Sequence, residues 1–148
     1  MAVRVQEEDF DVGLEFARFT EGRVDLGGVA LFVGLVRGDG QTVSAMTLEH
    51  YPGMTERQLE AIEAEARARW KLDDALIVHR VGRMKPGDRI VLVMTGSAHR
   101  KDSLEACQFL IDWLKTKAPF WKFEEGQGGG KWVDAKESDD AAAKRWGG

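Results

Sequence analysis

Basic side chains gather in one stretch of this sequence, residues 97–125. His99 and Arg100 stand where an extended segment gives way to a helical one. Lys115 falls in the last turn of that predicted helix, and Lys122 follows in an extended segment. The chain as a whole is acidic, with a formal net charge of -4. Cations that the fold can bring together therefore indicate an anion site. A lysine among other cations also loses its proton more readily, and can then act as a base or nucleophile.

A helix and a strand must position these cations. Asp102 and Glu105 have the spacing of a helix cap, and Pro119 ends the helix because the residue before a proline avoids helical geometry. The start of such a helix favours phosphate through its unpaired N–H groups and its dipole. Lys115 lies at the edge of the predicted buried face, which consists of Leu104, Cys107, Leu110, Ile111 and Leu114. Residues 120–124 then alternate, which places Phe120, Lys122 and Glu124 on one side of a strand and Trp121 and Phe123 on the other.

The other elements predict an α+β fold, because strands and helices follow one another without a regular βαβ rhythm. Helices are expected at 11–20, 55–70 and 138–146, strands at 3–6, 75–81, 89–95 and 132–133, and a flexible glycine-rich loop at about 126–130. Residues 28–37 form an apolar run typical of a strand buried on both faces, in which Gly34 indicates a bulge or the close approach of another backbone. The turn residues at 38–40 predict a hairpin to a strand at 42–50.

Length and composition bound the classes of function. With 148 residues, of which 43% are hydrophobic and 31% charged, we expect one domain, 1–148, rather than a disordered chain. No apolar run approaches the length of a membrane span, and the N-terminus lacks an apolar signal core, so we expect a cytoplasmic protein without a membrane partner. The single cysteine, Cys107, fits a reducing compartment, and the acidic total argues against nucleic acid as a partner.

Other chemistries find little support in the sequence. Ser97, His99 and Asp102 include the residue types of a hydrolase triad, but no nucleophile-elbow pattern surrounds them. The three histidines lack the spacing of metal ligands, so no metal site is predicted. His99 is as readily a core or capping residue as a phosphate ligand, and a single lysine is usually a surface residue with its stem on the protein. A non-catalytic module that binds a phosphate ligand or a partner therefore stays open as an alternative.

Five motifs in order carry a resemblance to a known family. They are FVGLVR at 32–37, LEHYPGM at 48–54, HRVG at 79–82, SAHR at 97–100 and LKTKAPFWK at 114–122. Together they closely resemble the large, catalytic subunits of molybdopterin synthase. The resemblance implies an α/β hammerhead fold and a homodimer of large subunits. It also implies a small ubiquitin-like sulfur-carrier subunit with a C-terminal Gly-Gly at each outer end, which makes a heterotetramer overall.

The resemblance implies a reaction and its residues as well. Two sulfurs pass from the thiocarboxylated Gly-Gly tail of the small subunit to cyclic pyranopterin monophosphate, which becomes the dithiolene of molybdopterin, and no cofactor is expected. By motif position, Lys115 and Lys122 look like the catalytic lysines. The substrate-contacting residues look like Leu35, Val36, Arg37, His99, Arg100, Lys115, Lys122, Phe123 and Glu124. Lys136 falls where members of this family can carry an arginine, and a lysine there keeps the charge but loses the bidentate fork.

Overall fold

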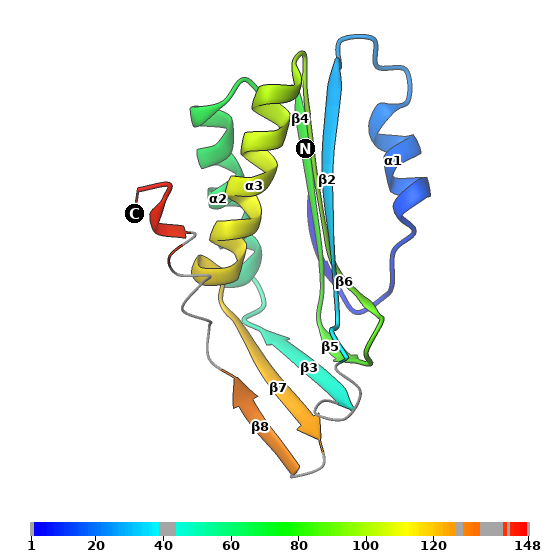
Figure 1. Cartoon of the computed structure of the whole chain (residues 1–148), viewed down its shortest axis with the longest axis vertical. Coiled ribbons are helices and arrows are strands. Elements are labelled where there is room, and N and C mark those ends of the chain that lie inside the picture. The colour runs from blue at the N-terminus through cyan, green and yellow to red at the C-terminus, as the bar shows by residue number, and fades with distance from the viewer. Residues whose placement is uncertain (1, 39–43, 127–128, 134–140, 142, 148) are drawn as a thin grey trace.

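Two four-stranded sheets organise the chain in the computed structural model, which describes residues 2–38, 44–126, 129–133, 141 and 143–147 (Figure 1). Sheet A has the strand order β1-β4-β6-β2, and sheet B has the order β5-β3-β7-β8. The strands are β1 (Ala2–Gln6), β2 (Gly28–Leu35), β3 (Ala45–His50), β4 (Asp74–Arg80), β5 (Gly82–Met84), β6 (Arg89–Ser97), β7 (Phe120–Gly126) and β8 (Gly129–Val133). The helices are α1 (Val12–Thr20), α2 (Met54–Arg69) and α3 (Arg100–Lys117). Only the pairing of β1 with β4 is parallel among these described strands, so the predicted α+β class with a mixed sheet is confirmed.

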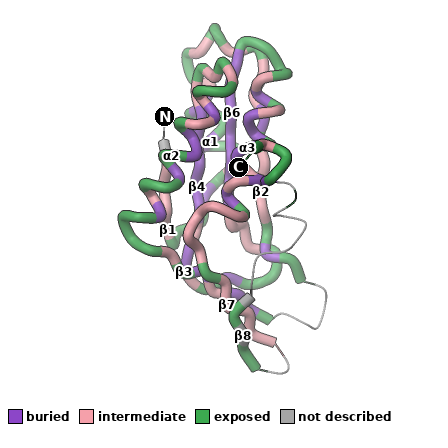
Figure 2. Tube along the Cα trace, turned by 90° about the vertical axis from the view of Figure 1, so that its left-hand side faces the viewer, coloured by how far each residue is buried: buried purple, intermediate pink, exposed green. Residues whose placement is uncertain are grey.

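Sheet A is covered on both faces, by α2 and α3 on one side and by α1 on the other (Figure 1). Alternation along the strands sorts the core residues between the two faces. Ile77 and Val93 pack toward the helix pair, whereas Leu76 and Leu92 pack toward α1. Figure 2 shows buried residues concentrated along β4 and β6, the two central strands. Sheet B continues from the lower end of sheet A, and it carries the residues that follow α3 (Figure 1).

The pairing of β2 differs from the sequence prediction. β2 pairs antiparallel with β6, and β3 pairs with β5 and β7, so the predicted hairpin between 28–37 and 42–50 is wrong. β2 is also an edge strand with Leu31 and Leu35 exposed, and the prediction that it is buried on both faces is wrong. Pairing of β2 with β6 is favoured over a hairpin with β3 because it aligns eight residues of β2 with β6. Gly34 does mark a bulge, and a Cβ there would approach Val91 Cγ1 to 2.8 Å.

Helix α3 begins one turn earlier than its cap signal predicts. It starts at Arg100 with His99 as N-cap, so Asp102 lies inside the first turn. Leu104 is exposed, whereas Ala106 and Phe109 are fully buried. The remaining predicted core positions lie in or against the core: Cys107, Leu110, Ile111 and Leu114. The real buried face is therefore rotated toward Phe109, which contacts three aromatic rings of the helix pair and the C-terminal segment.

Trp146 fastens the C-terminal segment to the helix pair α2 and α3. Trp146 packs against Trp70 and Phe109, and its indole N–H donates a hydrogen bond of 2.7 Å to the buried carboxylate of Asp112. This anchor holds the C-terminal segment against the helix pair. Of the predicted terminal helix, 141 and 143–144 are helical, and 138–140 lie outside the described residues. The predicted glycine-rich loop at about 126–130 is wrong at both ends, because β7 extends to Gly126 and β8 begins at Gly129, and the two residues between lie outside the described part of the chain.

Thr55 ties the start of α2 to the start of β7. Its buried hydroxyl accepts a hydrogen bond from the Tyr51 N–H (2.9 Å) and donates one to the Pro119 carbonyl (3.1 Å).

None of the described helices is long and apolar enough to cross a membrane.

Replacing Thr55 by valine is expected to lower the free energy of unfolding by about 2 kcal/mol. The substitution keeps the shape of the side chain but leaves a buried N–H and a carbonyl without their partner. Urea unfolding of both proteins measures the difference. Thr116→Val is the matched control, because the Thr116 hydroxyl only adds a bond to a helical carbonyl of its own turn. An equal effect of the two substitutions would contradict this role of Thr55.

Candidate functional site

The C-terminal end of α3 carries a small pocket beside Lys115. The pocket has a volume of about 20 Å³ and lies between α3 and the strands of sheet A. Its lining consists of Phe32, His79, Val91, Val93, Ile111, Leu114 and Lys115, a set we call the Lys115 pocket. Lys115 and His79 are the two polar side chains of this set. Lys115 itself is exposed in the single chain, so this chain alone does not shield its side chain from water.

His79 forms the buried side of the Lys115 pocket. Its ring stacks on Phe120, with 3.9 Å between ring centroids and an angle of 17° between the planes. Its Nδ1 lies 2.9 Å from the carbonyl oxygen of Arg80. Burial lowers the pKa of His79 to about 4, and the nearby positive charges of Lys115 and His50 act in the same direction. The imidazole is therefore neutral at physiological pH.

Lys122 approaches the same region from β7. The register pairs Phe120 with His50, Lys122 with Leu48, and Glu124 with Met46. Phe120, Lys122 and Glu124 thus share one face of β7, as the alternation predicts. Lys122 is half-buried, and its Nζ lies 3.7 Å from a carboxylate oxygen of Glu124. Because Phe120 stacks on His79 and Lys122 is two residues further along the same face, β7 leads directly from the Lys115 pocket to Lys122.

The segment 35–37 also reaches this face of sheet B. Val36 packs with Met46 and Leu48, the cross-strand neighbours of Glu124 and Lys122. Its backbone is fixed to the turn after β5 by two hydrogen bonds, both of 2.8 Å. The residues on either side of it, 35 and 37, are exposed. The structure therefore brings this segment to the face of sheet B that carries Lys122, with a guanidinium at its exposed end.

The remaining predicted contacts lie elsewhere in the single chain. Phe123 is on the opposite face of β7 from Lys122, where its ring lies 5.2 Å from that of Trp132. His99 and Arg100 are exposed at the start of α3, the upper end in Figure 1. Fifteen helical residues separate Arg100 from Lys115, which is about 22 Å along the axis. One chain by itself therefore does not join this pair to the lysines. Lys136 lies outside the described residues.

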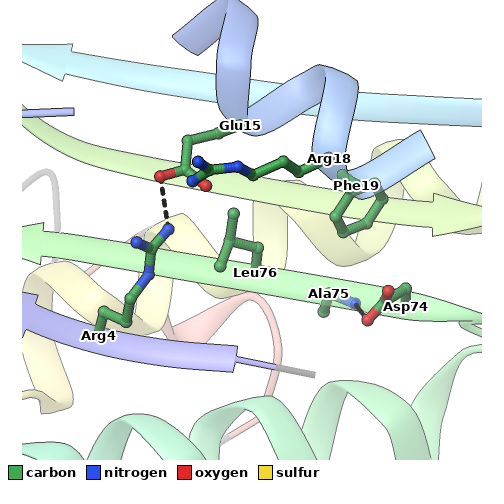
Figure 3. Close-up of a pocket in the computed structure, with 7 residues that line it drawn as sticks. All are labelled: Arg4, Glu15, Arg18, Phe19, Asp74, Ala75 and Leu76. Atoms are coloured by element: carbon green, nitrogen blue, oxygen red, sulfur yellow. Dashed lines mark hydrogen bonds and ion pairs between the residues drawn. The ribbon is translucent and has the colours of Figure 1, made fainter. Parts of the chain in front are cut away.

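A larger hollow lies on the other face of sheet A, against α1 (Figure 3). Its volume is about 270 Å³, and its lining consists of Arg4, Glu15, Arg18, Phe19, Asp74, Ala75 and Leu76. Both of its acids are engaged. Glu15 accepts a hydrogen bond of 2.6 Å from Arg4, and Asp74 accepts one of 3.0 Å from Arg23. This hollow is thus a neutral arrangement of ion pairs over an apolar floor, and sheet A separates it from Lys115.

Sequence reasoning missed His79, Phe120 and His50 as members of the site. The available signal for His79 was a histidine inside an otherwise apolar strand. A buried imidazole needs a hydrogen-bond partner, so its presence in such a strand indicates a specific role. No cluster of three or more His, Cys, Asp or Glu side chains suited to a metal ion occurs within the described ranges. Burial raises the pKa of the Cys107 thiol to about 11, which fits the predicted core role of this cysteine.

The chemistry available here is that of one amine, Lys115, beside a neutral imidazole, with a second amine, Lys122, further along β7. A lysine of this kind can move protons, and a second ammonium can stabilise negative charge that develops on a substrate. Arg37 adds a donor suited to a phosphate or a carboxylate. The site therefore fits reactions of an anionic substrate that need proton transfer.

Comparison with known proteins gives consistent matches over this chain. Residues 5–117 match the family model described as MoaE protein. A curated relative from Ralstonia nicotianae, named molybdopterin synthase catalytic subunit, is 52% identical over 147 residues, which cover 98% of this chain and 84% of the relative. The relative of the same name from Escherichia coli K12 is 51% identical and covers 96% of this chain and 95% of its own length.

Solved structures share the fold. The molybdopterin biosynthesis MoaE protein from Burkholderia ambifaria superposes with a TM-score of 0.86 at 52% identity, and the match covers 100% of this chain and 99% of that one. A Helicobacter pylori structure, described as the complex of subunits 1 and 2 of molybdopterin-converting factor, has a TM-score of 0.74 at 21% identity, with 91% and 90% covered. At that identity the likeness shows the fold alone.

Proposed function

Because the chain belongs to the MoaE protein family, whose curated members are molybdopterin synthase catalytic subunits, we propose that it transfers sulfur to a pterin phosphate. The sulfur donor is the thiocarboxylated Gly-Gly tail of a small ubiquitin-like subunit. Two such transfers convert cyclic pyranopterin monophosphate into the dithiolene of molybdopterin. The observation that supports this proposal is the path from Lys115 to Lys122: Lys115 lines a pocket with His79, His79 stacks on Phe120, and Lys122 lies two residues further along the same face of β7.

Each cation has a role that its position supports. Lys115 moves protons during sulfur addition and the loss of oxygen that follows. Lys122 stabilises negative charge on the substrate or on the thiocarboxylate oxygen, and Glu124, 3.7 Å away, orients its ammonium group. Arg37 holds the phosphate through charge-assisted hydrogen bonds. Leu35 and Val36 shape the wall beside the substrate.

The small subunit delivers its tail to these lysines. A Gly-Gly end has no side chains, so it can thread a narrow channel toward Lys115 and Lys122. Curated relatives about half identical to this chain are named the catalytic subunit of molybdopterin synthase, and that name implies a second subunit, which supports a partner of that kind here. The partner binds at each end of a dimer of large subunits, which makes a heterotetramer.

The dimer explains where His99 and Arg100 act. They lie about 22 Å along α3 from Lys115 in one chain, too far to touch the same small substrate. A second copy that places its own α3 start beside the first copy's Lys115 completes the phosphate site. The exposure of both residues in the single chain supports this arrangement.

Mixing two inactive variants tests the shared site. Lys115→Met and Arg100→Ala are each expected to be nearly inactive alone, since each substitution removes a required side chain from both pockets of the dimer. When the two chains exchange, half of the dimers are mixed, and each mixed dimer has one intact pocket out of two. Activity should therefore recover to about a quarter of the wild-type value if dimers form at random. If mass spectrometry shows mixed dimers but the activity does not recover, the shared site is wrong. Residues 99–100 then act in the same pocket as Lys115 of their own chain, or they lie outside the pocket.

Reconstitution tests the proposed function itself. The purified chain, a thiocarboxylated small subunit and the pyranopterin precursor are incubated and assayed for dithiolene product, with two sulfurs consumed per product. The control replaces the thiocarboxylate by an ordinary carboxylate and should give no product. If the chain binds the precursor but forms no dithiolene with the competent partner, it is a phosphate-binding module and the proposal is wrong.

A further inference from the structure

Among the side chains around Lys115, His79 is the polar group to which the proposed function gives no role. It comes from β4, in the centre of sheet A, and it is buried. The other lining residues, apart from Lys115, are apolar. A cavity of about 20 Å³ has room for about one water molecule between the imidazole and the amine. The two polar groups therefore face a common small space with no other polar side chain in its lining.

The hydrogen bond to Arg80 fixes the tautomer of His79. A carbonyl oxygen can only accept, so the Nδ1 that lies 2.9 Å from the Arg80 carbonyl carries the proton. The other ring nitrogen, Nε2, then keeps its lone pair and is an acceptor. Stacking on Phe120 holds the plane of the ring, so the acceptor has a fixed direction.

We propose that His79 is a positioning residue for Lys115, whose ammonium group is held by the Nε2 acceptor directly or through one water. This inference rests on the proposed function only for its effect on catalysis. The hydrogen bond orients Lys115 relative to β7, where Phe120 and Lys122 follow one another on the same face. A lysine has four rotatable bonds, and such a partner selects the reactive orientation before the substrate arrives.

The surroundings keep His79 an acceptor across the working pH range. Lys115 faces it from α3 and His50 from β3, and the electrostatic effect of each lowers the pKa of His79. Burial is the larger cause, and together they lower the pKa of His79 to about 4. The carbonyl of Arg80 favours the protonated ring, but this does not outweigh burial. The ring of His79 is therefore neutral at physiological pH, which suits an acceptor that positions Lys115.

Two amide variants separate positioning from structural support. His79→Asn keeps a donor near the place of Nδ1, where it can still reach the Arg80 carbonyl, but loses the acceptor. His79→Gln extends further and returns a carbonyl oxygen near the place of Nε2. We expect His79→Asn to lower kcat about 10-fold or more with little change in KM, and His79→Gln to stay within about 3-fold of wild type. Thermal unfolding of both variants checks that the fold is retained.

Nuclear magnetic resonance on the complete chain gives a readout that needs no activity. Nitrogen-15 spectra of His79 should show one Nδ1–H tautomer that does not change between pH 8 and pH 5.5. The titration of Lys115, followed through its ε-methylene carbon, should move to lower pH in His79→Asn and return in His79→Gln, because an acceptor stabilises the ammonium form. These spectra can be interpreted even if reconstitution yields no dithiolene. A failed reconstitution would therefore contradict the proposed function, whereas unexpected spectra would contradict the positioning role of His79.

Two results would overturn the positioning role. One is a Lys115 titration that is the same in wild type and in a folded His79→Asn variant. The other is an equal loss of kcat in the asparagine and glutamine variants, because a lost imidazole of purely structural importance would affect both alike.

Discussion

Replacement of Lys115 by methionine is expected to slow dithiolene formation by about 10²- to 10⁴-fold, the range for losing a positioned acid or base. Methionine keeps an unbranched, flexible stem at the edge of the Lys115 pocket, next to Leu114, but has no group that can move a proton. The expected loss therefore lies in kcat, because in the proposed site the precursor is held by Arg37 and by cations of a second copy and should bind with nearly its original affinity. Single-turnover rates with a saturating thiocarboxylated partner measure the chemical step separately from product release.

Lys117→Met is the matched control for this variant. Lys117 lies in the same last turn of α3, but its Nζ lies 4.8 Å from the ring of Trp113, outside the lining of the Lys115 pocket. Its removal deletes the same charge from the same helix end and should leave the rate within about twofold of wild type. A wild-type rate for Lys115→Met, or equal losses of rate in the two variants, would contradict the proton-transfer role. Lys115 would then contribute only its positive charge, as the neighbouring lysine does.

Replacement of Glu63 by glutamine is expected to stabilise the protein at pH 8 by about 3 kcal/mol and to have almost no effect at pH 4. Glu63 lies on α2 with its side chain fully buried. Neither carboxylate oxygen has a hydrogen-bond partner among the described residues, and the Nε of Arg67 lies 3.6 Å away. Burial raises the pKa of Glu63 to about 7, although the positive charge of Arg67 works against this.

The direction of the pH dependence follows from that raised pKa. The folded state binds the Glu63 proton more tightly than the unfolded state, in which the pKa is near 4.5. The favourable contribution of the protonated carboxyl is therefore fully present below about pH 4.5, and it is lost as the pH rises to about 7. Glutamine has no proton to lose, so the advantage of Glu63→Gln should grow over the same interval.

Urea unfolding at pH 4 and pH 8 measures this difference, and the other titrating groups cancel because both proteins contain them. Glu65→Gln is the control on the same helix. Glu65 is half-exposed and pairs with Arg69 at 2.9 Å, so its replacement should change stability by less than about 1 kcal/mol at either pH. A Glu63→Gln effect that is equal at pH 4 and pH 8 would show that the carboxyl does not titrate in this range.

Some features of this protein follow from local sequence alone. The strand of alternating residues around Lys122 and the proline that ends α3 depend on neighbours a few positions away, and both are found as predicted. The mixed class of the fold and the bulge at Gly34 also follow from such short-range patterns. Motif order pointed to the family, which the comparisons show.

Other features depend on contacts between distant segments, which no local pattern records. The partner of β2 is β6, some sixty residues away, because strand pairing is decided by the total area that each alignment buries. An apolar strand that contains one histidine signals an unusual residue, but the place of His79 beside Lys115 depends on β4, α3 and β7 meeting, which no local pattern shows. The sequence likewise predicted that the fold could bring the cations of 97–125 together, but one helix of 18 residues holds Arg100 and Lys115 at opposite ends. The sequence by itself therefore determined the family and the class of the fold and named candidate residues, and the tertiary structure alone decided which of those candidates one chain can bring together.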